Sequence, residues 1–226
     1  MDEFSVAEVA AVLDFAVLKP DQTSRDIDSA AAVCGEFAIG CLCVQPVAVS
    51  RAVSLLRDQT TVVASVVGFP HGANTTAVKV HEARVARDNG AREVDMVLAL
   101  HALRDGEHTT VYDDIAAVVD EVRASEVAVK VILETCYLTE DEIIHACQLA
   151  ESAGAMFVKT STGFGSQGAT PEVVKTMLNT VDGRIGVKAS GGIRTWDDCV
   201  TYLKMGCMRI GVGDPLAILS SAPKKN

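Results

Sequence analysis

Short β-branched apolar runs alternate with longer, charged, alanine-rich stretches of helical period along the whole chain, and no linker interrupts this order. The apolar runs predict strands, and because a helical stretch separates each run from the next, the strands are expected to lie parallel. The eight expected strands are Leu13–Leu18, Ala38–Val44, Val62–Phe69, Glu93–Leu98, Ala128–Glu134, Met156–Thr160, Ile185–Ala189 and Met208–Val212.

The stretches between these runs carry helix signals. In Asn74–Asn89 the periodicity predicts a buried face and a face toward water. The expected buried residues are Val78, Val85 and Ala86, and the expected solvated ones are Lys79, Glu82 and Arg87. Thr139, followed by three acidic residues, predicts the start of a later helix, since a hydroxyl cap and carboxylates both suit a helix N-terminus.

This order of elements predicts an α/β fold, a (β/α)₈ TIM barrel that forms a single compact domain over residues 1–226. Eight βα units in this length average roughly 28 residues each, which is the compact end of the range for such barrels. A doubly wound open sheet is the alternative, and it is typically accompanied by a dinucleotide-binding glycine fingerprint that this chain does not show. In a barrel, polar residues at the C-terminal ends of the strands are expected to converge on one face.

The net charge of −10 and pI near 4.9 exclude a broad basic surface for nucleic acid or anionic lipid. No apolar run is long enough to span a bilayer, and the acidic first residues are not those of a secretory signal. The seven cysteines lie mostly in apolar segments and the five histidines lack ligand spacing, so we expect buried thiols, no metal site and a cytoplasmic location.

Two lysines are embedded in apolar strands, Lys159 in Phe157-Val158-Lys159 and Lys188 in Gly186-Val187-Lys188. They are one βα unit apart, so a barrel places them on adjacent strands. Two neighbouring ammonium groups in a partly dry site lower each other's pKa, which frees one amine to act as a nucleophile at neutral pH. The alternative is that one or both lysines point outward and reach water between strand and helix.

Asp95 lies in the middle of an expected strand, and strand alternation points it away from the side of Val94 and Met96. Inside the barrel it would hold one lysine amine protonated and relay protons, or it would form a buried ion pair that fixes the core. Asp14, beside the first strand, allows the same interpretations and also that of a solvated residue at the strand entry.

Glycines follow the last two expected strands, where barrels often build a phosphate site from loop N–H groups. Gly191, Gly192 and Gly213 are therefore candidate phosphate-binding residues, and ordinary turn chemistry is the alternative. Cys43 lies in an apolar strand, where most thiols are inert core groups, and His71 lies on an expected loop at the C-terminal face.

At these residues the chain resembles the deoxyribose-phosphate aldolase family over nearly its whole length. The two lysine-bearing segments are the most specific, because both occur in order and one βα unit apart. The matching segments are Leu13-Asp14 with Leu18-Lys19-Pro20-Asp21-Gln22-Thr23, Cys43-Val44-Gln45-Pro46, Val66-Val67-Gly68-Phe69-Pro70-His71-Gly72, Glu93-Val94-Asp95-Met96-Val97, Phe157-Val158-Lys159-Thr160-Ser161-Thr162-Gly163-Phe164 and Val187-Lys188-Ala189-Ser190-Gly191-Gly192-Ile193-Arg194-Thr195.

The resemblance implies a class I aldolase that reversibly cleaves 2-deoxy-D-ribose 5-phosphate to D-glyceraldehyde 3-phosphate and acetaldehyde. It implies that Lys159 forms the Schiff base, that Lys188 lowers its pKa and that Asp95 transfers protons. It also implies that the ligand is a small phosphorylated sugar, that the enzyme needs no metal or cofactor, and that the chain can form a homodimer. The implied substrate-binding and phosphate-binding residues are Asp14, Cys43, Thr160, Gly163, Gly191, Gly192 and Gly213.

Two segments depart from the family pattern. Phe15-Ala16 stands where the family usually has His-Thr, which removes a polar contact near Asp14 or leaves it to another residue. Asp214 stands where Ser or Thr is common, and its carboxylate would repel a phosphate unless it turns away. Two other functions therefore stay open: a Schiff-base aldolase for another small carbonyl compound, and a non-catalytic sugar-phosphate binder.

Overall fold

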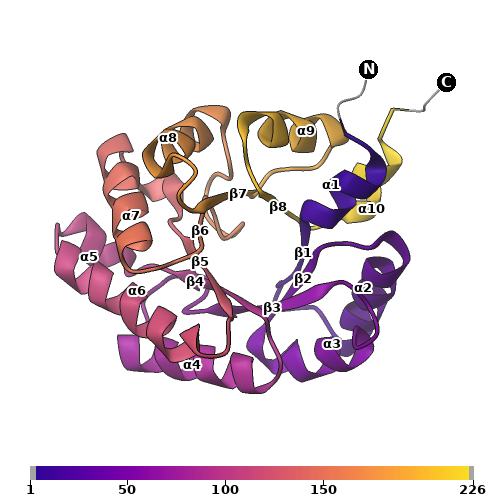
Figure 1. Ribbon diagram of the computed structural model, residues 1–226, viewed down its shortest axis with the longest axis horizontal. Coiled ribbons are helices and arrows are strands. Elements are labelled where there is room, and N and C mark those ends of the chain that lie inside the picture. Colours follow the sequence, from indigo (N-terminus) through magenta and orange to yellow (C-terminus); the bar gives the residue numbers. More distant parts are fainter. Residues whose placement is uncertain (1–3, 224–226) are drawn as a thin grey trace.

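The computed structural model describes residues 4–223, in which eight parallel strands close into a barrel (Figure 1). The strands pair in sequence order and β1 pairs with β8, so the predicted barrel is confirmed and the open sheet is excluded. The strands are β1 (Leu13–Val17), β2 (Cys41–Val44), β3 (Val62–Val67), β4 (Glu93–Val97), β5 (Ala128–Ile132), β6 (Phe157–Lys159), β7 (Gly186–Ser190) and β8 (Arg209–Val212).

Helices surround the ring of strands on its outer side (Figure 1). None of the helices within residues 4–223 has the length and apolar character needed to cross a bilayer. They are α1 (Val6–Val12), α2 (Ser24–Phe37), α3 (Val49–Leu55), α4 (Thr76–Asp88), α5 (Leu100–Arg104), α6 (His108–Arg123), α7 (Glu140–Ser152), α8 (Pro171–Val181), α9 (Trp196–Met205) and α10 (Pro215–Ser220), with 3₁₀ turns η1 (Pro46–Ala48) and η2 (Thr135–Tyr137).

The strand boundaries differ from the predicted ones by a few residues. The largest difference is at β2, because α2 continues to Phe37 and Ala38 ends it with a left-handed conformation at φ 51°. β5 ends two residues early because Glu134 also takes a left-handed conformation, at φ 54°. Apolar runs continue through such helix and strand ends, so the pattern alone does not mark them.

The prediction for α4 is wrong for Val78, Val85 and Lys79, whereas Ala86 is buried as predicted. Lys79 is fully buried, whereas Val78 and Val85 are 44% and 37% exposed. The ammonium of Lys79 lies 2.6 Å from Asp114 of α6 and donates to the Val97 carbonyl at 3.0 Å. A buried charge is stable when it is paired and hydrogen-bonded, and here the partner lies on another helix, where sequence periodicity does not reveal it.

The interior of the barrel differs from the aliphatic layer between strands and helices. On the side of β1 to β3 it holds a small apolar cluster, while charged side chains come from β4 to β8 and, with Asp14, from β1. The apolar cluster consists of Leu18, Cys41, Cys43, Ala64 and Val66, with Ala16, Val62 and Phe69 packed against it.

Candidate active site

Charged side chains from neighbouring strands face one another across the barrel interior. Their strands pair Asp95 with Lys130, Lys159 with Lys188, and Lys188 with Arg209, so these residues point to the same side of the sheet. Because burying an unpaired charge is very costly, each of them is expected to have an ionic partner. The group consists of Asp14, Glu93, Asp95, Lys130, Lys159, Lys188 and Arg209, all buried except Arg209, whose side chain is 19% exposed.

Lys159 and Lys188 lie side by side and share one acceptor. Each ammonium nitrogen lies 2.8 Å from the same oxygen, Oδ2 of Asp95. Both side chains are at least 97% buried, so the interpretation in which they point outward to water is wrong.

Burial is the largest cause that lowers the pKa of Lys159 below its ordinary value. Asp95 opposes this change, and Lys188 adds to it as a neighbouring cation. The neighbouring cation thus acts on the pKa of Lys159 in the expected direction, and burial is the larger cause. Burial also lowers the pKa of Lys188, but Asp14 and Asp95 together outweigh it and hold the pKa of Lys188 above its usual value. Lys159 is therefore the more readily deprotonated of the two amines.

Asp95 is the point where three lysines meet. Its Oδ1 accepts from Lys130 at 2.8 Å, while Oδ2 accepts from Lys159 and Lys188. Burial raises the pKa of Asp95, but the three lysines outweigh burial and hold the pKa well below its usual range. Asp95 is thus a carboxylate that lies within hydrogen-bonding distance of both Lys159 and Lys188, which is the geometry needed to pass a proton between them.

Asp14 is fully buried in β1, so it is not a solvated residue at the strand entry. It accepts a hydrogen bond from Lys188, and its Oδ1 accepts from Arg209 at 2.6 Å. Phe15 and Ala16, which stand where the family usually has His-Thr, both make apolar contacts. Phe15 packs against the aliphatic core, and Ala16 packs against the apolar cluster of the interior. Lys188, Arg209 and, at 3.3 Å, Lys130 supply the polar contacts of Asp14.

Three charged residues of this group were missed by the sequence analysis: Lys130, Glu93 and Arg209. The signal for Lys130 was present, because it lies between two valines and precedes Lys159 by the same interval that separates Lys159 from Lys188. Glu93 precedes Asp95 by two residues, so alternation places both on one face. Arg209 begins β8, and no local pattern distinguishes it from a solvated residue at a strand end.

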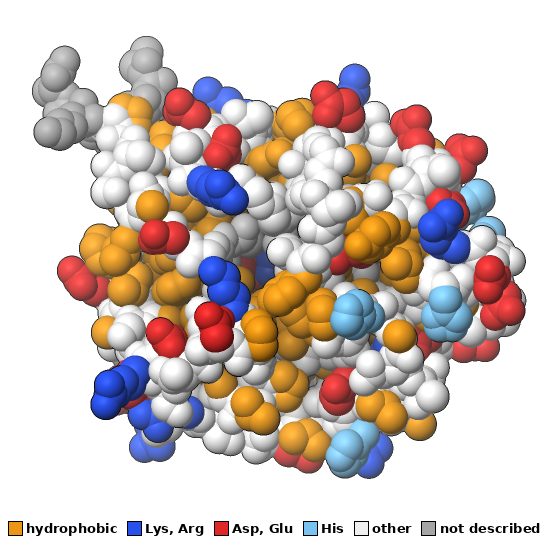
Figure 2. All heavy atoms as spheres, turned by 180° about the vertical axis from the view of Figure 1, so that it is seen from behind, with side chains coloured by type: hydrophobic (Ala, Val, Ile, Leu, Met, Phe, Trp, Pro, Cys, Tyr) orange, Lys and Arg blue, Asp and Glu red, His pale blue; other side chains and the backbone are white. Residues whose placement is uncertain are grey.

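A cavity of about 470 Å³ lies at the C-terminal ends of β1 to β3. Leu18 and Val66 line it and also belong to the interior apolar cluster that contains Cys43, so the cavity lies directly above that cluster. Phe164 borders the cavity and packs edge-on against Phe69, with ring centroids 5.3 Å apart. Figure 2 shows this face, hollowed near its centre with hydrophobic side chains beside the hollow.

Thr160, a predicted substrate-binding residue, is fully buried. Its hydroxyl donates to the Ser190 carbonyl at 2.9 Å and accepts from the Ser190 N–H at 3.0 Å, so it joins the ends of β6 and β7. The thiol of Cys43 is 1% exposed in the interior, and burial raises its pKa to about 11, so it stays protonated. His71 is exposed and lines a smaller cavity of about 110 Å³ beyond Phe164.

The predicted phosphate-binding glycines lie at the rim of the same face. Gly163, Gly191 and Gly192 have φ values of 88°, 86° and 81°, a region that favours glycine. A Cβ atom at Gly192 or Gly213 would meet no atom within 4 Å, so open space lies beside both. The carboxylate of Asp214 accepts from the Ala217 N–H at 3.0 Å and caps α10, so it turns toward its own helix.

Among residues 4–223, the group with metal-ligand geometry consists of Asp14, Cys41 and Glu93. Its carboxylates already contact cations: Lys130 lies 2.5 Å from Glu93, and Arg209 lies 2.6 Å from Asp14. These atoms are engaged in ion pairs, and burial raises the pKa of the Cys41 thiol well above its usual value.

A buried amine of lowered pKa that shares a carboxylate oxygen with a second lysine, inside a (β/α)₈ barrel, is an arrangement suited to the class of lysine-dependent aldolases. Comparison with known proteins gives the same class. The model of the DeoC/LacD family of aldolases matches residues 9–210. The chain therefore belongs to the DeoC/LacD aldolase family.

Individual relatives agree with this assignment. A deoxyribose-phosphate aldolase from Carboxydothermus hydrogenoformans is 45% identical over 95% of this chain and 95% of its own length. The structure of a putative deoxyribose-phosphate aldolase from Coccidioides immitis has a TM-score of 0.93 and 40% identity, covering 96% of this chain and 86% of the other. A tetrameric deoxyribose phosphate aldolase from Aeropyrum pernix has a TM-score of 0.90 and 29% identity, covering 96% and 92%.

Proposed function

We propose that this chain is a class I aldolase that reversibly cleaves 2-deoxy-D-ribose 5-phosphate to D-glyceraldehyde 3-phosphate and acetaldehyde. The observation that supports it most is the buried Lys159 amine, whose pKa is lowered and whose nitrogen lies 2.8 Å from Asp95. An uncharged amine has the lone pair that attack on an aldehyde requires.

In the proposed reaction, the Lys159 nitrogen bonds to the aldehyde carbon of the open-chain sugar, and loss of water gives a protonated imine. The C3 hydroxyl then loses its proton, the C2–C3 bond breaks, and its electron pair moves into the imine to form an enamine. D-glyceraldehyde 3-phosphate leaves, C2 gains a proton, and water releases acetaldehyde and the free amine. Asp95 and Lys188 exchange protons with Lys159 through the shared oxygen.

The substrate's position is also a proposal. The cavity above the apolar cluster of Cys43 would hold the sugar chain, and the backbone N–H groups near Gly191, Gly192 and Gly213 would bind the phosphate. The open space beside Gly192 and Gly213 and the turn of Asp214 toward α10 support this placement, since neither blocks nor repels an anion there.

We also propose a cytoplasmic homodimer. The seven cysteines are free thiols and all but Cys136 are buried, which suits a reducing compartment. Light scattering on the purified chain tests the assembly: a mass of twice 23.8 kDa is expected, and any other mass rejects the dimer.

The experiment that tests the function is reductive trapping. Sodium borohydride added with acetaldehyde at neutral pH should attach an ethyl group to Lys159, identified by peptide mass spectrometry, and 2-deoxyribose 5-phosphate should be turned over. Lys159→Met should lose both adduct and turnover, while a control Lys175→Met, at a residue of the outer helix α8, should keep both. A wild-type chain without adduct or turnover contradicts the proposal.

A further inference from the structure

The charged residues of the barrel interior form a closed ring in which positive and negative groups alternate. Starting at Arg209, the contacts run to Asp14, then to Lys188, Asp95, Lys130 and Glu93, and from Glu93 back to Arg209. Arg209 lies 2.6 Å from Asp14, which also contacts Lys188. Asp95 lies 2.8 Å from both Lys188 and Lys130. Glu93 lies 2.5 Å from both Lys130 and Arg209, which closes the ring. A further contact of 3.3 Å joins Lys130 to Asp14 across the ring.

Within this ring three carboxylates are matched by three cations. Within residues 4–223, the hydrogen bonds and ion pairs of Lys159 join it to the ring through Asp95 alone, whose Oδ2 it shares with Lys188. If Lys159 is protonated, the interior therefore carries a fourth positive charge without a carboxylate of its own. In a buried site an unmatched charge is unfavourable, so the balance of the ring favours the neutral amine at Lys159 over a neutral amine elsewhere.

We propose that Arg209 and Glu93 are positioning residues that complete this ring and thereby make Lys159 the amine that is free to react. In the part of the chain that the structure describes, no hydrogen bond or ion pair joins either residue to Lys159. Arg209 acts through Asp14 on Lys188, and Glu93 acts through Lys130 on Asp95. The inference rests on the proposed Schiff-base function of Lys159 and adds two residues to it.

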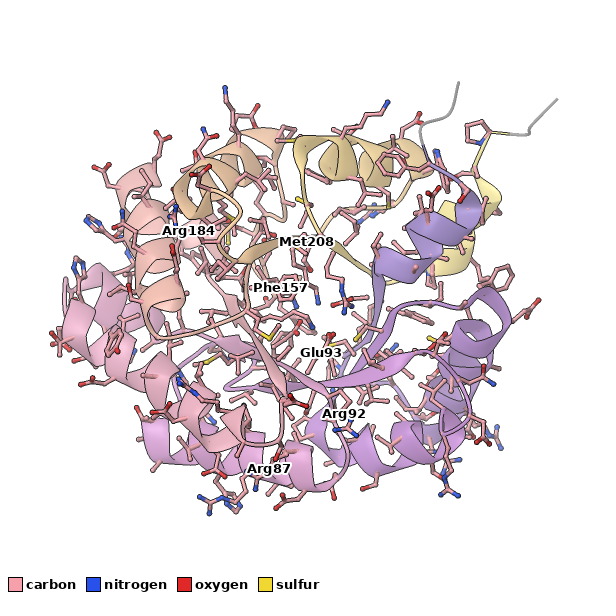
Figure 3. All side chains as sticks on the ribbon, viewed as in Figure 1. Arg87, Arg92, Glu93, Phe157, Arg184 and Met208 are labelled. Atoms are coloured by element: carbon pink, nitrogen blue, oxygen red, sulfur yellow. The ribbon has the colours of Figure 1, made fainter. Side chains whose placement is uncertain are left out.

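The part of the ring that contains Arg209 and Glu93 lies toward the N-terminal ends of the strands. Arg209 and Glu93 are the first residues of β8 and β4, on the side away from the substrate cavity, and Figure 3 shows Glu93 within the ring of strands and Arg87 among the helices outside it. Arg209 and Glu93 are therefore not expected to contact a substrate that binds at the C-terminal ends of the strands. Within residues 4–223, the other ionisable groups of the interior that the ring and the apolar cluster contain are Asp14 of β1, Cys41 and Cys43 of β2, Glu93 and Asp95 of β4, Lys130 of β5, Lys188 of β7 and Arg209 of β8, and burial keeps both thiols protonated.

The two residues have opposite charges, so removing them should have opposite effects. The readout is the pH at which borohydride trapping of Lys159 with acetaldehyde reaches half of its maximal rate. Arg209→Met removes a cation and should move this midpoint up by about one pH unit, and Glu93→Gln removes an anion and should move it down by a similar amount. At a pH below the midpoint, each shift is a change of about tenfold in trapping rate, lower for Arg209→Met and higher for Glu93→Gln.

Two further variants separate charge from shape. Arg209→Lys keeps the charge and should leave the midpoint within about 0.3 pH unit of wild type even if the chain is less stable. The double variant Arg209→Met with Glu93→Gln restores the balance of charges and should return the midpoint toward wild type. Arg92→Met, at an exposed arginine next to Glu93, controls for the loss of a positive charge outside the barrel and should not move the midpoint.

The outcomes distinguish this inference from the function on which it rests. If wild type forms no adduct at Lys159, the proposed function fails. If wild type forms the adduct but Arg209→Met and Glu93→Gln keep its midpoint, or shift it in the same direction, the ring does not select the amine and the inference is overturned. Thermal unfolding of each variant, followed by circular dichroism, shows which variants are folded and can be compared. If Arg209→Met does not fold, the test rests on Glu93→Gln, whose side chain is close in shape to that of the wild-type residue. The direction in which Glu93→Gln shifts the midpoint then decides.

Discussion

Lys159 and Lys188 are register partners on adjacent strands, and their ammonium nitrogens lie at the same distance, 2.8 Å, from one oxygen of Asp95. They nevertheless differ in environment, because Lys188 has a second carboxylate, Asp14, and Lys159 does not. This difference in carboxylate partners gives two residues of the same type pKa values that are shifted in opposite directions. In the proposed function, Lys188 stays charged and Lys159 is the nucleophile.

The first prediction concerns this division. Lys188→Met removes a cation that lowers the pKa of Lys159 and leaves Asp95 to Lys159, so the pKa of Lys159 should rise. Borohydride trapping at pH 7 should fall by about tenfold and recover at a pH about one unit higher than in the wild-type chain. An equal loss of trapping at every pH would instead mean that Lys188 acts only on packing.

The second prediction concerns acid stability. The pKa of Asp14 is held far below its usual value in the folded chain, because Lys130, Lys188 and Arg209 together outweigh burial. A carboxyl of lowered pKa contributes stability above its unfolded pKa, about 3.9, and this contribution is lost as the pH falls below that value.

Asp14→Asn should therefore reduce the free energy of unfolding by about 3 kcal/mol at pH 7, because Lys130, Lys188 and Arg209 all lose a partner. Below pH 4 the difference from wild type should shrink by about 1.4 kcal/mol per pH unit. Urea unfolding between pH 3 and pH 7 measures both. A constant difference over this range would show that the charge of Asp14 does not provide the stability.

The third prediction concerns the loop after β6. The buried carboxylate of Glu134 accepts from the Thr162 N–H at 3.1 Å and from the Thr162 hydroxyl, which in turn accepts from the Phe164 N–H at 3.0 Å. Glu134 thus fixes the segment that places Phe164 against Phe69 at the cavity.

Glu134→Gln should weaken these hydrogen bonds by about 1 to 2 kcal/mol and lower kcat/KM by about tenfold. Glu126→Gln is the matched control, since Glu126 also has a positive φ but is exposed, and it should behave as wild type. If both variants keep wild-type kcat/KM, Glu134 does not position the loop.

The fourth prediction concerns phosphate. Because the Asp214 carboxylate caps α10, Asp214→Ser should keep the cap and leave the KM for the phosphorylated sugar within about twofold of wild type. A carboxylate that repelled the phosphate would give the opposite result, a KM severalfold lower in the variant. Steady-state kinetics with 2-deoxyribose 5-phosphate and with unphosphorylated 2-deoxyribose distinguish the two.

The barrel was predictable because it depends on a repeated pattern, β-branched runs that alternate with amphipathic stretches. Lys159, Lys188 and Asp95 were visible for a related reason, since charge inside an apolar strand stands out from its neighbours. Boundaries such as the start of β2 were not, because Ala38 ends α2 in a left-handed conformation that its residue type does not suggest.

The closed ring of charges could not be read from one sequence. Arg209 and Asp14 lie at opposite ends of the chain and meet only because β8 pairs with β1. Lys79 on α4 was predicted to be exposed to solvent for the same reason, because its partner Asp114 lies on α6. In each case a charge looks solvated until the fold supplies a partner from a distant element.

The most direct test of the account is the pH dependence of adduct formation at Lys159 in the wild-type chain. The rate of borohydride trapping with acetaldehyde, followed by mass spectrometry of the Lys159 peptide from pH 5 to pH 11, gives the midpoint at which this amine loses its proton. The account predicts a midpoint below the value of an ordinary lysine, about 10.4. A midpoint at or above that value, or an adduct on Lys188 or Lys130 in place of Lys159, would contradict it.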